Sequence, residues 1–209
     1  MTPNMPQKLK REMFDSIELR LSSYMPGRIY PTEIATTFNF ILYDEFKKKR
    51  RDDPWWKFWK RYSLKPTFVG QYMIDKSSPY QTRVYSHQGT EACSPIEIKR
   101  GVIGRAIRTG QDQYVPDVTK DYDHVGCDPN MEGSELVLIS WSNPYPSGPY
   151  TGKEIPLGVL DIDLNVKNVL IEEDIHRVRK IWDTYGKQIF PGSPKFLPKR
   201  SRFPVLQIA

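Results

Sequence analysis

Two cysteines and a pair of alternating acids are the residues of this chain whose types and spacing could do chemistry. Cys127 lies in a polar segment, His-Val-Gly-Cys-Asp at 124–128, and Cys93 lies upstream beside a glycine-rich turn. Further along, Asp161 and Asp163 alternate with the apolar residues of a strand-like run. Two thiols and a group of carboxylates are the parts that thiol redox chemistry on a small polar ligand requires.

Composition narrows the classes of protein to consider. The chain has 209 residues, 38% of them hydrophobic, which suits one domain with extensions. No apolar run approaches the roughly 18 residues of a membrane span, and the first ten residues contain no apolar core of a secretory signal. Two cysteines fit a reducing compartment, so the expected location is cytoplasmic. No Cys-x-x-Cys or His-x-x-x-His spacing is present, so no metal site is predicted.

The positive charge is confined to one segment. Residues 47–61 carry eight basic and two acidic side chains, a net charge of +6. The whole chain has the same net charge of +6. Large aromatic residues at 55–59 are interleaved with these cations, a pattern that suits a contact with an anionic membrane surface or a single-stranded nucleic acid. The alternative is a solvated helix end, favoured by the helix dipole, followed by an aromatic cap packed on a sheet.

Apolar periodicity predicts helices at both ends of the chain and strands between them. The expected helices span 7–22, a segment from 32 into the basic cluster, 101–110 and 170–189. The expected strands span 67–74, 82–87, 113–115, 135–141 and 157–164, and 116–133 is a long polar loop. Short connections between strands indicate an antiparallel sheet and an α+β fold class.

Four motifs in this order resemble a GAF domain. They are Gly-Val-Ile-Gly-Arg-Ala at 101–106, Tyr-Val-Pro-Asp-Val at 114–118, Ser-Glu-Leu-Val-Leu at 134–138 and Pro-Leu-Gly-Val-Leu-Asp-Ile-Asp at 156–163. The resemblance implies a GAF-like antiparallel sheet flanked by N-terminal and C-terminal helices. The domain would span 66–190, after a helical extension at 1–65 and before an extended tail at 191–209.

Among GAF domains the chain most resembles free methionine-(R)-sulfoxide reductase. The family places one cysteine ahead of the glycine-rich turn, has a His-x-x-Cys-Asp loop and has Ser-Glu before a strand that precedes Leu-Asp-Ile-Asp. By that resemblance Cys127 attacks the substrate and Cys93 resolves the product. The resemblance further implies that substrate is held by Glu135, Asp161, Asp163, Phe68, Tyr72 and Asp128.

The residue types are compatible with the chemistry that this resemblance implies. A protonated carboxyl must reach the sulfinyl oxygen, and Asp163, Asp161 or Glu135 could supply it because clustered carboxylates raise one another's pKa. The same acids suit an α-ammonium group, which a free amino acid has and a mid-chain residue lacks. No bound cofactor is expected. A thioredoxin-type dithiol would reduce the protein again.

Other interpretations remain open from the sequence. A non-catalytic GAF sensor that binds a small molecule would explain the Pro/Gly-rich connection at 143–153 and the longer cysteine loop. Asp161 and Asp163 could instead be the solvent-facing edge of a strand, and His124 a loop residue that only makes hydrogen bonds. The N-terminal helices could form the interface of a homodimer.

Overall fold

The computed structural model describes residues 5–51, 61–75, 77–127, 131–142 and 154–190. Within these ranges the helices are α1 (Gln7–Tyr24), α2 (Pro31–Lys47), α3 (Gly101–Thr109), α4 (Glu172–Ile189) and a short 3-10 helix, η2 (Val118–Lys120). The strands are β1 (Arg50–Arg51), β2 (Arg61–Tyr62), β3 (Pro66–Ile74), β4 (Gln81–Gly89), β5 (Ile96–Glu97), β6 (Gln113–Val115), β7 (Ser134–Trp141) and β8 (Pro156–Leu164).

Six of these strands form one antiparallel sheet with the order β5-β4-β3-β8-β7-β6. The predicted α+β fold class with an antiparallel sheet is confirmed. β8 is the last strand in the chain but lies inside the sheet, between β3 and β7. Its residues are therefore hydrogen-bonded on both sides, and only the two faces of the sheet decide what its side chains contact.

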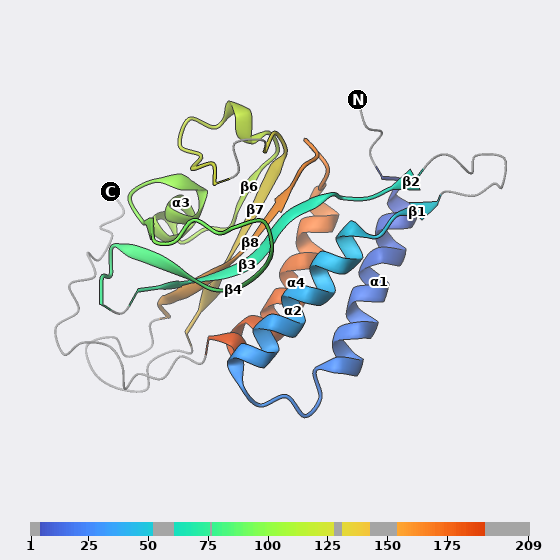
Figure 1. Ribbon diagram of the computed structural model, residues 1–209, viewed down its shortest axis with the longest axis horizontal. Helices are drawn as coiled ribbons and strands as arrows, with labels where there is room; N and C mark the ends of the chain where they lie inside the picture. Colours follow the sequence, from blue (N-terminus) through green and yellow to red (C-terminus); the bar gives the residue numbers. More distant parts are fainter. Residues whose placement is uncertain (1–4, 52–60, 76, 128–130, 143–153, 191–209) are drawn as a thin grey trace.

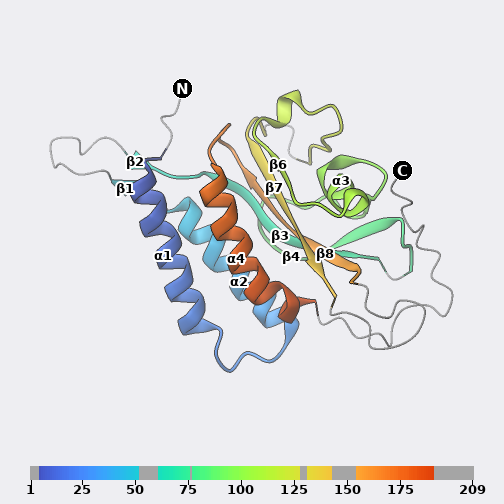
Figure 2. The ribbon, with the colours of Figure 1, turned by 180° about the vertical axis from the view of Figure 1, so that it is seen from behind.

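The two faces of the sheet are covered by different helices. Helices α2 and α4 lie against one face, α1 packs across them, and α3 lies on the opposite face (Figures 1 and 2). Successive side chains of a strand point to opposite faces, so the β7 side chains alternate between the two layers. Leu136 and Leu138 join the core under the three helices, whereas Val137 and Ile139 join the smaller core under α3. Functional side chains on the α3 face are thus backed by a large apolar layer.

A buried amide pair fixes α2 on the sheet. Asn39 of α2 donates from Nδ2 to Oε1 of Gln71 on β3 over 2.9 Å, and the Gln71 amide donates back to Oδ1 of Asn39. Both side chains are fully buried. Because an unpaired amide would be costly here, the exchange specifies the position of α2 along β3.

The predicted helices and the five predicted strands are present, with ends that shift by a few residues. The short strands β1, β2 and β5 were not predicted. β1 pairs with β2, so the described ends of the basic segment form a two-stranded ladder after α2 ends at Lys47. Residues 52–60, which include the aromatic cluster, lie outside the described residues, as does the predicted tail at 191–209. The domain boundary at 65 and the homodimer stay predictions.

None of the helices in the described ranges has the length and the apolar character needed to cross a membrane.

A buried ion pair joins the first and last helices and gives a test of the packing. Nζ of Lys10 lies 2.6 Å from Oδ2 of Asp174, both side chains are 4% exposed, and Nζ also donates to the carbonyl of Val169. Lys10→Met leaves the Asp174 carboxylate buried without its cation, which should lower the free energy of unfolding by about 3–5 kcal/mol. Urea-induced unfolding measures the change.

The matched control is Lys8→Met, because Lys8 is exposed on the same helix. It should change the free energy of unfolding by no more than about 0.5 kcal/mol. A Lys10→Met protein as stable as the Lys8→Met protein would contradict the structural role given to the ion pair.

Candidate active site

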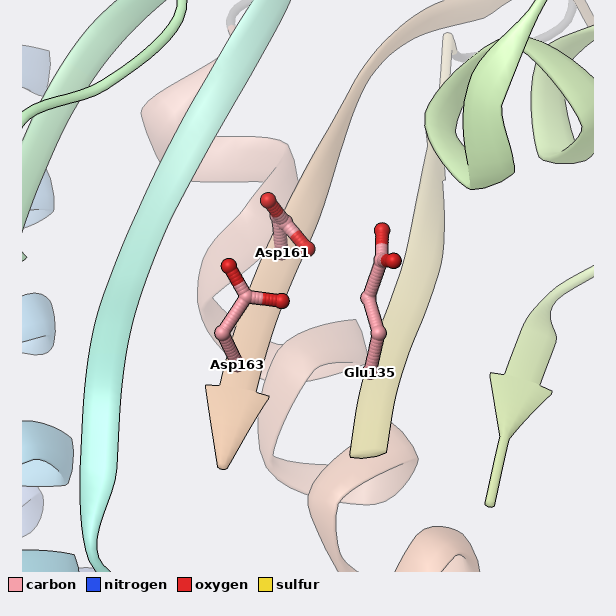
Figure 3. Close-up of side chains that lie close together, drawn as sticks. All are labelled: Glu135, Asp161 and Asp163. Atoms are coloured by element: carbon pink, nitrogen blue, oxygen red, sulfur yellow. The ribbon is translucent and has the colours of Figure 1, made fainter. Parts of the chain in front are cut away.

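Three carboxylates meet on the α3 face of the sheet. Asp161 and Asp163 lie two residues apart on β8 and so point to the same face, and Glu135 on β7 is the register partner of Asp163. One oxygen of each carboxylate lies within 4.8 Å of the other two, and Figure 3 shows the three side chains side by side. The interpretation of Asp161 and Asp163 as a solvent-facing strand edge is wrong, because β8 lies inside the sheet, Asp161 is buried and Asp163 is half-buried.

Burial raises the pKa of two carboxyls in this cluster. Glu135 and Asp161 are 6% and 4% exposed. Loss of solvation raises the pKa of each carboxyl well above its ordinary range, and the neighbouring carboxylates raise both further. Among the described residues, Oδ1 of Asp161 is also buried without a hydrogen-bond partner. Such an atom costs free energy until a donor reaches it, so the cluster suits a ligand that brings a positive charge or N–H groups.

The same cluster has the spacing that a metal ion would need. Among the described residues, Glu135, Asp161 and Asp163 form a group whose ligand atoms could surround one ion. Hard cations accept such all-oxygen ligands. The absence of a metal and of a bound cofactor stays a prediction.

An aromatic wall stands next to the acids. Phe68 and Tyr72 lie on β3, their ring centroids are 5.9 Å apart, and their side chains are 3% and 2% exposed. Burial raises the pKa of Tyr72, and the nearby carboxylates add to the effect, so its hydroxyl stays protonated. His87 of β4 stacks on the Phe68 ring at 5.4 Å. The site therefore has an apolar surface, formed by these aromatic rings, beside the polar surface of the three carboxylates.

The two cysteines meet at this site. Cys93 lies between β4 and β5, Cys127 lies in the segment after η2, and the two form a disulfide with a Cα–Cα distance of 5.5 Å. This distance lies within the range of about 7 Å that a disulfide requires. Cys93 is half-buried against the apolar core under α3, whereas Cys127 is exposed. The chain therefore brings together two thiols that are far apart in its sequence.

Helix α3 anchors the segment that leads to Cys127. Arg105 forms a two-pronged ion pair with Asp121, with Nη1 3.1 Å from Oδ1. Arg108, one turn further, donates to Asp123 at 3.3 Å. The backbone N–H of Gly101 donates to Oδ1 of Asp123 over 3.1 Å. These contacts join α3 to the cysteine segment, and sequence analysis did not assign any of these residues.

Gly101 is needed at the start of α3 for a physical reason. Its φ of +75° is a left-handed conformation that side chains rarely adopt, and a Cβ there would lie 3.1 Å from Cγ2 of Val125. Glycine thus lets α3 begin directly against the cysteine segment.

His124 joins the cysteine segment to the acids. Its Nε2 lies 3.5 Å from Oε2 of Glu135, which is beyond a normal hydrogen bond but within contact. Burial lowers the pKa of His124, although Asp121 opposes the shift. The lowered pKa of His124 and the raised pKa of Glu135 both favour the neutral forms of the two side chains. The sequence placed His124 in the His-x-x-Cys-Asp motif but left open a loop residue that only makes hydrogen bonds. Its contact with Glu135 was not predicted.

One cavity collects the predicted side chains. It measures about 30 Å³, which is room for one or two water molecules. Its lining includes the predicted Phe68, Tyr72, Cys127, Glu135, Asp161 and Asp163, and also His124 and Met131. Cys93 reaches it through the disulfide. The remaining predicted residue, Asp128, lies outside the described residues.

Comparison with known proteins assigns the chain to a family. No model of a protein family matches it. GAF domain-containing protein A of Dictyostelium discoideum is 31% identical over 119 residues, which make up 56% of this chain and 67% of that protein. The chain belongs to the GAF-domain family. This agrees with the GAF resemblance that the four sequence motifs carry.

Two further relatives of this GAF protein carry the name free methionine-R-sulfoxide reductase. The one from Saccharomyces cerevisiae is 34% identical over 108 residues, and the one from Escherichia coli is 35% identical over 94 residues. These alignments cover 52% and 45% of the GAF protein. The GAF protein spans about half the length of these relatives, 54% and 50% respectively.

Solved structures share the fold of this GAF protein. A structure described as a GAF domain gives a TM-score of 0.65 at 22% identity and covers 87% of this chain and 88% of its own. Free methionine-R-sulfoxide reductase from Neisseria meningitidis, solved in complex with its substrate, gives a TM-score of 0.62 at 22% identity, with 90% and 96% of the two chains covered. At this identity the likeness shows the fold.

The raised pKa of Asp161 predicts how the stability of the protein changes with pH. The folded state binds more protons than the unfolded state between the ordinary carboxyl pKa of about 4 and the raised value, so its free energy of unfolding falls as pH rises through that window. Asp161→Asn cannot ionise at this position. Its stability relative to the parent protein should therefore increase as pH rises, as measured by urea-induced unfolding over a pH series.

Asp117→Asn provides a control of opposite sign. A hydrogen bond from Thr119 lowers the pKa of Asp117, so this carboxylate stabilises the fold above its unfolded pKa and loses that contribution as pH falls. The Asp117→Asn protein should therefore lose stability relative to the parent as pH rises. If the difference between Asp161→Asn and parent did not vary with pH, the raised pKa of Asp161 would be wrong.

Proposed function

We propose that this GAF protein reduces free L-methionine-(R)-sulfoxide to methionine and ends the reaction with a disulfide between its two cysteines. The observation that carries the proposal is the Cys93–Cys127 disulfide, because Cys127 lines the same cavity as the buried acids. The yeast and E. coli relatives, aligned over about half their length, are named for this activity.

The reaction balances with the residues at this site. The Cys127 thiolate attacks the sulfoxide sulfur, and a carboxyl of the cluster gives a proton to the sulfinyl oxygen. We assign this proton transfer to Asp163, with Asp161 or Glu135 as the source of its proton. The oxygen passes to Cys127, which becomes a sulfenic acid as methionine leaves. The Cys93 thiol then attacks the sulfenic sulfur, water leaves and the disulfide forms. A thioredoxin-type dithiol supplies the two electrons that restore the thiols.

The cluster supports a preference for a free amino acid. An α-ammonium group brings N–H donors and a positive charge, and Oδ1 of Asp161 is a buried acceptor without a hydrogen-bond partner. Its charge would lower the raised carboxyl pKa values and stabilise the ionised forms. Phe68, Tyr72 and Met131 would enclose the apolar methyl end of the substrate.

The size of the cavity supports binding of the substrate to the dithiol form. The disulfide form leaves about 30 Å³, far below the roughly 300 Å³ of a small ligand pocket. We therefore expect the substrate to bind the dithiol form, after the segment that carries Cys127 is released from Cys93.

Turnover should depend on the two cysteines in different ways. Cys127→Ser should abolish reduction of the (R) epimer, because it removes the attacking sulfur. Cys93→Ser should still release methionine in a single turnover but should lose most of its multiple turnover with thioredoxin. The measurement is NADPH consumption in a thioredoxin-coupled assay with the (R) and (S) epimers. Reduced, folded protein that binds methionine but turns over neither epimer would contradict the proposal and favour a GAF sensor.

Discrimination at the amino group tests the role of the acids. The parent protein should turn over free methionine-(R)-sulfoxide far better than its N-acetyl derivative, which has no ammonium. Asp161→Asn should raise KM for the free amino acid by about 10–100-fold, since a hydrogen bond to a charged group contributes about 1.5–3 kcal/mol. It should leave the N-acetyl derivative nearly unchanged. Equal losses with both substrates would indicate a general defect of the cavity instead.

A further inference from the structure

The two sulfurs of the disulfide have different surroundings. Cys93 is half-buried and packs against the apolar core under α3, which includes Val102 and Ile103. Cys127 is exposed, and it also lines the cavity. An external thiol can therefore approach one sulfur more easily than the other.

We propose that the reductant attacks Sγ of Cys127 and that Cys93 is the leaving thiolate. The reductant's thiolate forms a new S–S bond with Cys127 as the Cys93–Cys127 bond breaks, and the electron pair of that bond leaves on Cys93. The rate of such an exchange depends on access to the attacked sulfur, and access favours Cys127. This inference rests on the proposed function only for the identity of the substrate that oxidises the cysteines.

The geometry also favours a dithiol reductant over a monothiol. After the first step the Cys93 thiol remains next to Cys127, since their Cα atoms are 5.5 Å apart in the disulfide form. With a monothiol, Cys93 attacks Cys127 again and expels it, so the disulfide closes. A dithiol carries its own second thiol to the same bond, leaves as a cyclic or intramolecular disulfide, and frees Cys127. A thioredoxin-type protein has this chemistry.

Sγ of Cys127 then reacts with two different molecules in turn, the sulfoxide and the reductant. Cys127 attacks the sulfoxide in one half-reaction and receives the reductant in the other. Because Cys127 lines the cavity, a reductant bonded to it stands where the substrate must enter. Substrate and reductant therefore exclude each other at Cys127.

A chemical map of the mixed disulfide tests this inference. The full-length oxidised protein is mixed with glutathione, quenched in acid after short intervals, and its freed thiol is blocked with N-ethylmaleimide before peptide mass spectrometry. Cys127 should carry at least about ten times more glutathione than Cys93, because access to the sulfur governs the exchange. Maleimide should be found on Cys93. Glutathione found chiefly on Cys93 would overturn the inference.

Two comparisons sharpen the result. The same map in guanidinium chloride should lose the preference, because unfolding exposes both sulfurs. Dithiothreitol should reduce the disulfide to completion at a thiol concentration where glutathione leaves most of it closed. Equal reduction by the two reagents would contradict the preference for a dithiol.

A binding experiment tests the exclusion of substrate. Cys93→Ser protein is treated with oxidised glutathione, so that Cys127 carries a stable adduct, and is compared with untreated Cys93→Ser protein. Methionine should raise the melting temperature of the untreated protein only. An equal rise in both would overturn the exclusion. The peptide map uses no sulfoxide and no turnover, so failure of the reductase activity and failure of this inference can be told apart.

Discussion

Two acids buried on the central strands are the constraint around which this protein is organised. Removing Glu135 and Asp161 from water costs free energy if they ionise, so both retain their protons far above the pH at which an exposed carboxyl loses them. Stability must come from elsewhere in the fold. The large core under α1, α2 and α4 lies on the opposite face of the same strands. Its burial of apolar side chains offsets the cost of the acids that β7 and β8 place on the α3 face.

The cysteine segment and the acids belong to separate parts of the chain, and α3 connects them. It packs on the sheet through its apolar side and pairs with Asp121 and Asp123 through Arg105 and Arg108. The sheet positions the carboxyls and α3 positions the segment, so the packing of α3 on the sheet places the disulfide beside the carboxyls. Groups held close together in this way are what proximity effects in catalysis require.

Membership in the GAF-domain family accounts for the scaffold but not for the chemistry. One fold can carry many unrelated sites, and function has to be argued from the residues in the site. Here a disulfide, buried carboxyls and an aromatic wall coincide around one cavity. A GAF domain without these features would share the sheet and the helices but not this site.

Much of the fold could be predicted because it depends on local spacing. The apolar residues of α1 recur with a helical period, and the strand at 157–164 alternates acids with aliphatic residues, so these elements followed from the chain alone. The order of motifs also brought Cys93 and Cys127 into one hypothesis. The strands β1 and β5 were missed because each has only two residues, and pairing with a partner rather than its own composition makes it a strand.

The protonation and contacts of the site depended on tertiary structure. Asp161 alternates with apolar residues in the way of an exposed strand edge. Its burial depends on the position of β8 between β3 and β7 and on the packing of α3 over this face of the sheet. The contact of His124 with Glu135 likewise joins segments that the sequence separates. Such features follow from which strands pair and which face a helix covers. These choices are determined by the free energy of the whole packed chain, whereas sequence spacing determines only the local periodicity of each element.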